Sequence, residues 1–192
     1  LVLLIPTMDR NGAEKQVCLL AENLPRDLFD VHVMLLTRDG PRSERLRDAG
    51  IPVTLIGKRF QADPSALMRL RRELRRLRPD VIHTWIFAAN SFGRVAARMA
   101  GVPRILASER CVDPWKSEAH FWIDRRLARL TDSITTNSHG VKDFYVAHGI
   151  DPELFRIIPN GIEPRECEEI DRDEAFRRLD VDPASKLILA VG

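Results

Sequence analysis

The sequence predicts an α/β fold, a Rossmann-like doubly wound sheet of about seven mainly parallel strands with helices on both faces. Short apolar runs typical of buried strands alternate with longer amphipathic segments from Leu1 to Ile158. Glycine follows several of the amphipathic segments, as it does after many helices. Strands that alternate with helices in this way form parallel sheets, because each crossover helix packs back onto the sheet.

The first elements follow from apolar spacing. Leu1–Ile5 is a continuous apolar run, which indicates a strand buried on both faces. Asn11–Leu24 places apolar residues at helical spacing. Val31–Leu36 is the next strand, and Ser43–Ala49 is a short helix that stops at Gly50.

The central elements repeat the pattern. Val53–Ile56 is a third strand, and Pro64–Leu77 is a helix with one leucine stripe and a proline in its first turn. Asp80–Thr84 is a fourth strand. Ala88–Ala100 is a helix that is closed by Gly101.

The last elements of this domain are shorter. Arg104–Ala107 and Ser133–Thr136 are strands, separated by a helix over Glu118–Leu130. Ser138–His148 is a helix that Ser138 caps. Phe155–Ile158 is the seventh strand, and a proline followed by an Asn-Gly turn pair ends it.

The composition changes after this turn, and we expect residues 1–162 to form one N-terminal domain. Residues 163–192 are expected to be a linker and the first elements of a truncated C-terminal domain. Within them the pattern predicts a helix over Asp173–Leu179 and a buried strand over Lys186–Val191.

The composition excludes several classes of protein. A net charge of +2 is too small to indicate nucleic-acid binding by itself. No apolar run approaches the ~20 residues of a membrane span. The three cysteines form no C-x-x-C pair, and we find no spacing typical of a metal site. We therefore expect a cytoplasmic protein without a metal.

The first loop after a strand is a candidate phosphate site. Asn11 and Gly12 allow a close-approach backbone at the start of a helix, and Glu14 follows in the first turn. Free N–H groups and the helix dipole favour a phosphate at such a position. The alternative is a plain strand–helix turn with Asn11 as its N-cap.

Two later loops carry further candidates. His83 ends the fourth strand, where a lone histidine is more often structural than catalytic, and Asn90 follows in the same segment. Trp85 either lines a pocket or fills the core. After the fifth strand, Glu109 is placed to orient an acceptor hydroxyl and Arg110 to bind an anion. The alternative is a Glu109–Arg110 pair that only fixes the loop.

Six arginines crowd the helix over Pro64–Leu77 and its end. One interpretation is a solvated amphipathic face. The other is docking to an anionic membrane surface through Arg69, Arg72 and Arg76, which would place the protein peripherally at the inner face of a membrane. Nucleic acid would also suit the charge, but no binding motif accompanies it.

Six segments resemble, in order, the N-terminal domain of the retaining glycosyltransferases of family 4, which have the GT-B fold. The segments are Asn11–Val17, Pro79–Trp85, Ala100–Pro103, Ser108–Arg110, Asn137–Val141 and Ile158–Ile162. The resemblance implies a two-domain enzyme that transfers a sugar from a nucleotide-diphosphate donor with retention, to a glycan, a lipid-linked sugar or a polysaccharide precursor. It implies no metal cofactor.

The resemblance also assigns roles. Gly12, with Asn11 and Glu14, would approach the donor phosphates, while Glu109 and His83 are the catalytic candidates. Trp85, Asn90, Arg110, Asn137 and Ser138 would line the acceptor side or the cleft. Asn160 and Gly161 would sit at the crossover into the donor-binding half. Two departures stand out: Asn11 replaces a glycine, and Trp85 stands where the family often has a second histidine.

Two other functions remain open from the sequence. A nucleotide-sugar epimerase has the same fold, and a non-catalytic flavodoxin-like binding module would also match the strand–helix pattern. We expect residues 1–192 alone to be inactive, because the donor-binding half would lie beyond them.

Overall fold

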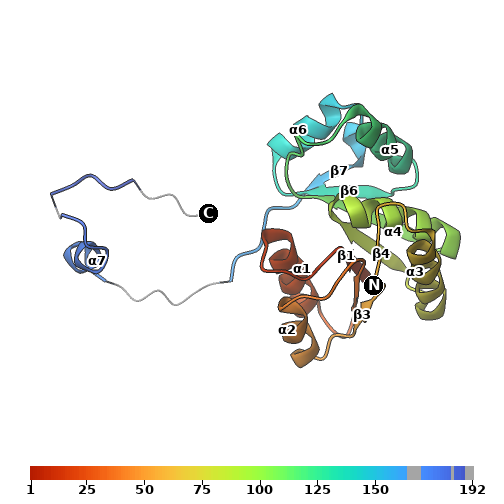
Figure 1. Ribbon diagram of the computed structural model, residues 1–192, viewed down its shortest axis with the longest axis horizontal. Helices are drawn as coiled ribbons and strands as arrows, with labels where there is room; N and C mark the ends of the chain where they lie inside the picture. The colour runs from red at the N-terminus through yellow and green to blue at the C-terminus, as the bar shows by residue number, and fades with distance from the viewer. Residues whose placement is uncertain (164–169, 183, 189–192) are drawn as a thin grey trace. The chain divides into compact units, whose positions relative to one another are not determined.

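The computed structural model describes residues 1–163, 170–182 and 184–188 (Figure 1). The chain divides into two compact units, Leu1–Gly161 and Ile162–Gly192, which are described separately below.

The first unit is built on one sheet of seven strands, all parallel, which confirms the predicted α/β fold. The strands are β1 (Val2–Ile5), β2 (His32–Leu35), β3 (Val53–Leu55), β4 (Val81–Trp85), β5 (Arg104–Glu109), β6 (Ser133–Thr136) and β7 (Phe155–Ile157). They lie in the order β3-β2-β1-β4-β5-β6-β7.

Six α-helices follow the strands of this unit. They are α1 (Gly12–Asn23), α2 (Arg42–Asp48), α3 (Pro64–Leu77), α4 (Ile86–Ala100), α5 (Glu118–Ala128) and α6 (His139–Ala147). The main differences from prediction lie at the ends of β4 and β5. Helix α4 begins at Ile86, directly after β4, and β5 continues to Glu109. The first shift brings Trp85, Ile86 and Phe87 into regular structure, and the second brings in Ser108 and Glu109.

The helices cover both faces of the sheet (Figure 1). Helices α3 and α4 pack on one face, where Leu4, Leu70 and Ala97 belong to one buried cluster. Helices α1 and α2 pack on the other face of β1 and β2 in a second cluster. A third cluster joins α5 and α6 to the last three strands around Phe121 and Tyr145.

The strand order creates a switch point between β1 and β4. The chain builds β2 and β3 on one side of β1 and then returns to place β4 on the other side. Because all strands are parallel, their carboxyl ends share one edge, and the loops after β1 and β4 diverge there. Ligands of open α/β sheets bind at this kind of edge.

Two glycines allow close packing near this edge. A Cβ added to Gly93 would lie 2.4 Å from Thr84 Cγ2, so α4 sits tightly on β4. A Cβ added to Gly40 would lie 2.4 Å from Met8 O, so the loop after β2 touches the loop after β1. A side chain at position 93 would push α4 away from β4, and one at position 40 would push the two loops apart.

The second unit contains helix α7 (Arg172–Arg178), one residue earlier at each end than predicted. The carboxylate of Asp171 accepts from the N–H groups of Asp173 and Glu174 and caps the helix. Residues 186–188 of the predicted strand are exposed and lie in no strand, and the rest of it lies outside the described residues. Most of the predicted linker, residues 164–169, also lies outside the described residues.

Candidate functional site

The loop after β1 differs from expectation at Asn11. Its backbone is extended, with φ −95° and ψ 177°, and its side chain makes no capping bond. The left-handed conformation that would favour glycine is therefore not needed here. A Cβ added to Gly12 would meet nothing within 4 Å, so the packing of this unit does not require glycine at position 12 either.

Glu14 lies in the first turn of α1 and is only 2% exposed. Its Oε1 is 3.1 Å from the hydroxyl of Thr7 and 3.4 Å from the side-chain amide of Asn11, and both groups donate to it. Its Oε2 is buried without a hydrogen-bond partner in the described residues. The structure thus places Asn11 and Glu14 together at the start of α1.

The β4–α4 junction is strained. Ile86 has φ +63°, a left-handed conformation that a β-branched residue rarely adopts. It follows Trp85, whose indole Nε1 is buried without a partner in the described chain. Such strain is often found at functional sites. The sequence did not single out Ile86, because conformation is not visible in residue identity.

His83 lies two residues before Trp85 in β4. Its Nε2 is 3.1 Å from the hydroxyl of Thr135 on β6, and its ring centroid is 4.8 Å from that of Trp85. Burial, with the nearby charge of Arg110, lowers the pKa of His83 to about 3. The imidazole is therefore neutral at physiological pH and takes part as a neutral hydrogen-bonding group.

Arg110 follows β5 and points along the same edge. Its guanidinium lies 5.1 Å from the Trp85 ring and donates to the side-chain oxygen of Asn160. Its Nε is buried without a partner in the described residues, and burial lowers its pKa. The structure therefore shows Arg110 bonded to Asn160, and the described contacts of Glu109 include no ion pair with Arg110.

Glu109 and Asn90 lie beneath this edge. Glu109 is 3% exposed; its Oε1 accepts from Asn90 Nδ2 at 2.9 Å, and its Oε2 lies 3.0 Å from the hydroxyl of Tyr145 on α6. Asn90 also donates to the carbonyl of Ser108. Both oxygens of Glu109 thus have partners within the fold. This geometry fits a residue that positions the loop after β5, and a direct role in catalysis stays a prediction.

These contacts belong to a larger buried charge cluster of Glu109, Asp113, Lys116, Asp124, Arg94 and Tyr145. Lys116 Nζ lies 2.9 Å from Asp124 Oδ2 and 3.3 Å from Asp113 Oδ2. Arg94 donates to the other oxygen of Asp124 at 3.1 Å. The cluster holds three carboxyl groups and two cations, and burial raises the pKa of Glu109.

The sequence analysis missed Lys116 and Tyr145. One signal was available: Tyr145 lies four residues after Val141, on the buried stripe of a predicted helix. A buried tyrosine hydroxyl needs a partner, so a polar group opposite it was to be expected. Its partners Glu109, Asp113 and Lys116, which are 36, 32 and 29 residues away in the chain, cannot be read from the pattern.

The remaining candidates lie at the ends of β6 and β7. The Ser138 hydroxyl accepts from the N–H of Val141 at 3.3 Å, which confirms Ser138 as the N-cap of α6. Asn137 Oδ1 is buried without a partner among the described residues. Gly161 pairs with the side-chain amide of Gln16 through both its N–H (2.8 Å) and its carbonyl (2.9 Å). Gln16 was not among the predicted site residues.

The carboxyl edge thus carries several buried polar atoms that lack a hydrogen-bond partner in the described chain. Buried polar groups are normally paired, and an unpaired one calls for an explanation such as a ligand or a water. The atoms are Glu14 Oε2, Trp85 Nε1, Ser108 Oγ, Arg110 Nε, Thr136 Oγ1 and Asn137 Oδ1.

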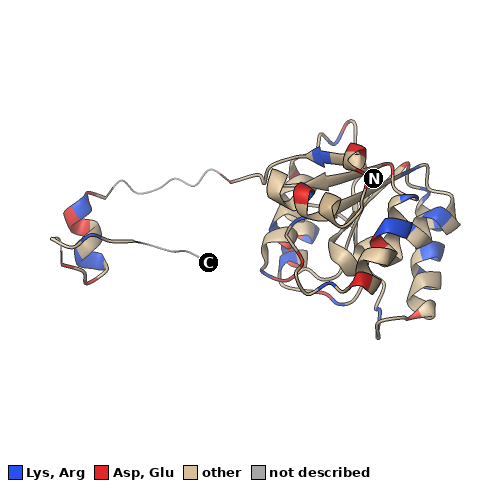
Figure 2. Ribbon diagram, turned by 90° about the horizontal axis from the view of Figure 1, so that it is seen from above, with Lys and Arg blue, Asp and Glu red and all other residues tan. Residues whose placement is uncertain are grey.

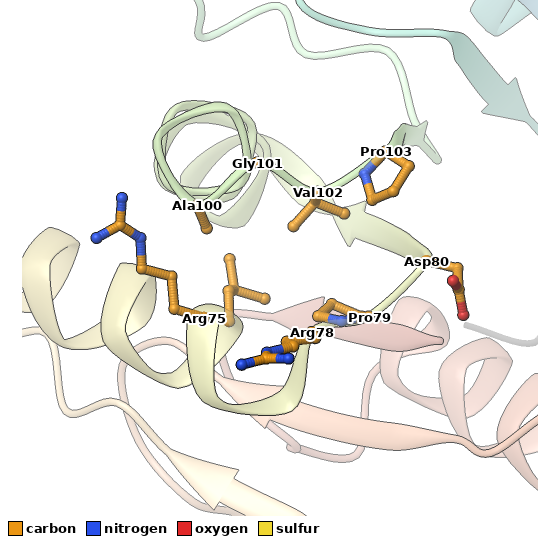
Figure 3. A pocket seen from close by; sticks show the side chains of 9 residues that line it. Arg75, Arg78, Pro79, Asp80, Ala100, Gly101, Val102 and Pro103 are labelled. Carbon is orange, nitrogen blue, oxygen red and sulfur yellow. The ribbon is translucent and has the colours of Figure 1, made fainter.

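The opposite edge of the sheet holds a pocket of about 500 Å³ between the ends of α3 and α4 (Figure 3). Arg75, Arg78 and Asp80 supply its polar groups, and Leu74 and Val102 are among its apolar lining. The pocket lies at the amino ends of β4 and β5, away from all the predicted site residues. Its size alone does not make it the functional site.

The arginines of α3 (Figure 2) differ in their surroundings. Arg69 donates to the carbonyls of Ile56 and Gly57 at 2.8 Å and to the Ser65 hydroxyl at 2.9 Å. The prediction that Arg69 faces a membrane together with Arg72 and Arg76 is therefore corrected. The guanidinium of Arg69 instead ties α3 to the residues that follow β3. Arg72 and Arg76 are exposed, and both lie within 4 Å of Glu73. In the described part of the chain, no helix has both the length and the apolar character needed to cross a bilayer.

Comparison with known proteins shows which family this chain resembles. The family described as Glycosyltransferase Family 4 matches residues 10–166. A curated relative, the Escherichia coli UDP-Gal:alpha-D-GlcNAc-diphosphoundecaprenol alpha-1,3-galactosyltransferase, is 25% identical over 153 residues, covering 74% of this chain and 39% of the relative.

Solved structures show the same fold. HepE of Anabaena, crystallised in complex with UDP, superposes with a TM-score of 0.75 at 19% identity, covering 93% of this chain and 49% of its own. A glycosyltransferase from Rickettsia africae gives 0.69 at 13% identity, covering 94% and 49%. A UDP-N-acetylglucosamine 2-epimerase gives 0.58 at 15% identity, covering 83% and 48%. The chain therefore spans about half the length of the solved proteins it resembles.

Proposed function

Because the chain belongs to glycosyltransferase family 4, we propose that its full-length gene product transfers a sugar from a nucleotide-diphosphate sugar to a glycan, a lipid-linked sugar or a polysaccharide precursor. We further propose that the anomeric configuration is retained. One observation carries the proposal: the unpartnered buried polar atoms of this family 4 domain gather at the carboxyl edge, beside the β1–β4 switch point.

The start of α1 is proposed to face the donor. Its first N–H groups and the helix dipole favour an anion there, and the open space around Gly12 leaves room for one. Glu14 Oε2 is available to accept a hydrogen bond from a sugar hydroxyl. Asn11 positions Glu14 through the contact between their side chains.

Arg110 is proposed to carry the positive charge of the site. It is half-buried, its Nε is unpartnered in the described chain, and one of its terminal nitrogens already holds Asn160. A guanidinium in this setting binds a phosphate or an acceptor oxygen strongly, because water screens it poorly. Protein cations of this kind can offset the charge of a leaving diphosphate, and we propose that no metal is required.

The neighbouring residues are proposed to shape the acceptor side. Trp85 and Asn137 offer an N–H donor and an oxygen acceptor at the edge. Glu109 and Asn90 act from below as positioning residues, because they hold the loop that carries Arg110. His83 supports the Trp85 ring as a neutral group.

The relatives suggest which donors to test first. The curated relative is named as a UDP-galactose enzyme, and HepE was crystallised with UDP. UDP-hexoses are therefore the first panel, and a lipid-diphosphate-linked sugar is the first acceptor. The 192 residues span only 39% to 49% of these relatives, and we propose that they do not transfer sugar alone.

The test is nucleotide release by the full-length gene product. UDP should appear only when donor and acceptor are both present, and the product should show the same anomeric configuration as the donor by proton NMR. An inverted product would refute retention. A protein that binds UDP-sugars and never turns them over would support a binding module of similar fold.

An epimerase is the second candidate, since an epimerase shares the fold with a TM-score of 0.58. It would consume a UDP-sugar with no acceptor and yield a rearranged sugar. The amounts of donor consumed and of sugar products formed, measured without acceptor, distinguish the two activities. An epimerase consumes the donor under these conditions, whereas a transferase does not.

A further inference from the structure

One glutamine side chain ties the segment that follows β7 to helix α1. The Oε1 atom of Gln16 accepts from the N–H of Gly161 at 2.8 Å, and its Nε2 donates to the Gly161 carbonyl at 2.9 Å. The two residues are 145 positions apart in the sequence and meet where the chain passes beside α1 after β7 (Figure 1). Because both backbone groups of Gly161 are held, this Gln16–Gly161 pair fixes the orientation of the segment as well as its distance from α1.

The helix side of this pair is the rigid side. Gln16 is half-buried, and its neighbours Val17 and Cys18 belong to the buried cluster that packs α1 onto the sheet. Asn160 and Gly161 are exposed and lie in neither a helix nor a strand. A segment with few buried contacts is free to move unless specific bonds hold it. The side chain of Gln16 therefore positions the segment against the helix.

The pair acts on Asn160 through a peptide bond. The N–H of Gly161 belongs to the same planar unit as the Cα and carbonyl of Asn160. A hydrogen bond to that N–H therefore restricts where Asn160 can lie. The side-chain oxygen of Asn160 in turn accepts from a terminal nitrogen of Arg110. A chain of contacts thus runs from α1 to the cation of the carboxyl edge.

Arg110 is the group that benefits from this chain of contacts. Its guanidinium lies between the Trp85 ring, 5.1 Å away, and the side chain of Asn160. A long arginine side chain has many rotamers, and a partner that selects one of them in advance reduces the entropy lost on binding. We propose that Gln16 is a positioning residue, which holds Asn160 in place through Gly161 and thereby orients Arg110 for sugar transfer. The inference rests on the proposed function.

The alternative is a contact that only anchors the chain and stabilises the fold. Both bonds of the Gln16–Gly161 pair are exposed and join neutral groups. Such bonds add little to stability, because water replaces them in the unfolded chain. We therefore expect the loss of Gln16 to affect turnover more than unfolding.

The first test is turnover by the full-length gene product with a UDP-hexose and an acceptor. Gln16→Met keeps the length of the side chain but can form neither bond, and it should lower kcat/KM about tenfold. Gln61→Met is the matched control, because Gln61 is an exposed glutamine in the loop before α3. The control should stay within about twofold of wild type, and the urea midpoints of both variants should stay close to that of the wild type.

A double-mutant cycle separates positioning from anchoring. If Gln16 acts through Arg110, Gln16→Met should lower kcat/KM by less than about twofold once Arg110→Gln is already present. A residue that only anchors the chain would give the same fold-loss with and without Arg110→Gln, and that result would overturn the proposal. Wild-type turnover in Gln16→Met would also overturn it.

Amide hydrogen exchange follows the Gln16–Gly161 pair without any sugar transfer. In the substrate-free full-length protein, the N–H of Gly161 should exchange several times faster in Gln16→Met than in the wild type or in Gln61→Met. Equal exchange rates would show that the pair does not hold the segment and would overturn the proposal. Faster exchange together with wild-type turnover in Arg110→Gln would instead refute the proposed role of Arg110, and the positioning role would fail with it.

Discussion

The two edges of the same sheet differ in whether their polar side chains have hydrogen-bond partners within the described chain. At the carboxyl edge, Glu14, Trp85 and Arg110 keep buried polar atoms without partners in the described chain. At the amino edge, Arg75 and Arg78 line the pocket, but Arg75 and its neighbour Arg71 already donate to the carbonyl of Met99. A cavity and a local excess of charge are therefore weaker signs of a site than unsatisfied buried groups.

The physical reason lies in helix direction. Helices α3 and α4 end at the amino edge, where their last carbonyls need donors and carry partial negative charge. The arginines of α3 satisfy that need for α4. At the carboxyl edge, helices begin and present N–H groups, so an anion is favoured there instead. The same helix dipoles make one edge a binding edge and the other a capping edge.

The largest effect on stability is expected in the buried charge cluster around Lys116, which lies beneath the carboxyl edge. Lys116→Met removes the cation between Asp113 and Asp124 and should lower the free energy of unfolding by about 3–5 kcal/mol. Arg72→Met on the exposed part of α3 should change it by less than about 0.5 kcal/mol. Urea denaturation measures both, and equal values would show that the cluster does not support the edge.

His83 should set a pH dependence. Its folded-state pKa of about 3 lies below the ordinary value of 6.5, so its contribution to stability is complete above pH 6.5 and is lost as the pH falls toward 3. Below pH 6.5, the unfolding free energy of the wild-type protein should therefore fall with decreasing pH more steeply than that of His83→Asn, by up to about 1.4 kcal/mol per pH unit. The measurement is urea denaturation of both proteins at several pH values between 4 and 8. The same dependence of the unfolding free energy on pH in both proteins would contradict this prediction.

Gly12 tests whether a ligand, and not the fold, needs the open space at α1. Gly12→Ala should lower kcat/KM about tenfold, the effect of about 1.4 kcal/mol lost at the transition state. Stability should not fall, because a Cβ there meets no atom within 4 Å. Gly140→Ala on α6 is the matched control, since its Cβ also meets nothing within 4 Å. Unchanged turnover in both variants would remove Gly12 from the site.

The smallest effect is expected at the amino edge. Arg78 ends α3 with φ +48°, a conformation that glycine adopts without strain. Arg78→Gly should raise the free energy of unfolding by up to about 1 kcal/mol and leave turnover within about twofold. Thermal unfolding and the nucleotide-release assay measure the two quantities, and a marked loss of turnover would return the pocket to consideration.

Much of the fold could be predicted from the sequence, because strands buried on both faces read as short apolar runs. The exception at β4 is informative: Ile86 begins α4 in a left-handed conformation, which no apolar pattern reveals. The predicted strand over Lys186–Val191 lies partly outside the described residues, and residues 186–188 form no strand.

The candidate site was harder to predict, because its contacts join distant parts of the chain. Arg110 meets Asn160 and Gln16 meets Gly161, across 50 and 145 residues. Glu109 looked like a loop residue open to substrate, yet β5 continues through it and buries it. Arg69 looked like a surface charge, yet it holds two carbonyls. Residue type and spacing located the edge but could not assign the partner of each side chain.

The central claim, that sugar transfer takes place at the carboxyl edge, is tested most directly by comparing one arginine from each edge. In the full-length gene product with UDP-hexose and acceptor, Arg110→Gln should lower kcat/KM by about 10- to 100-fold, the loss of one charged hydrogen bond of about 1.5–3 kcal/mol. Arg75→Gln, at the amino-edge pocket, should stay within about twofold. Unchanged turnover in Arg110→Gln, or a greater loss in Arg75→Gln, would contradict the account.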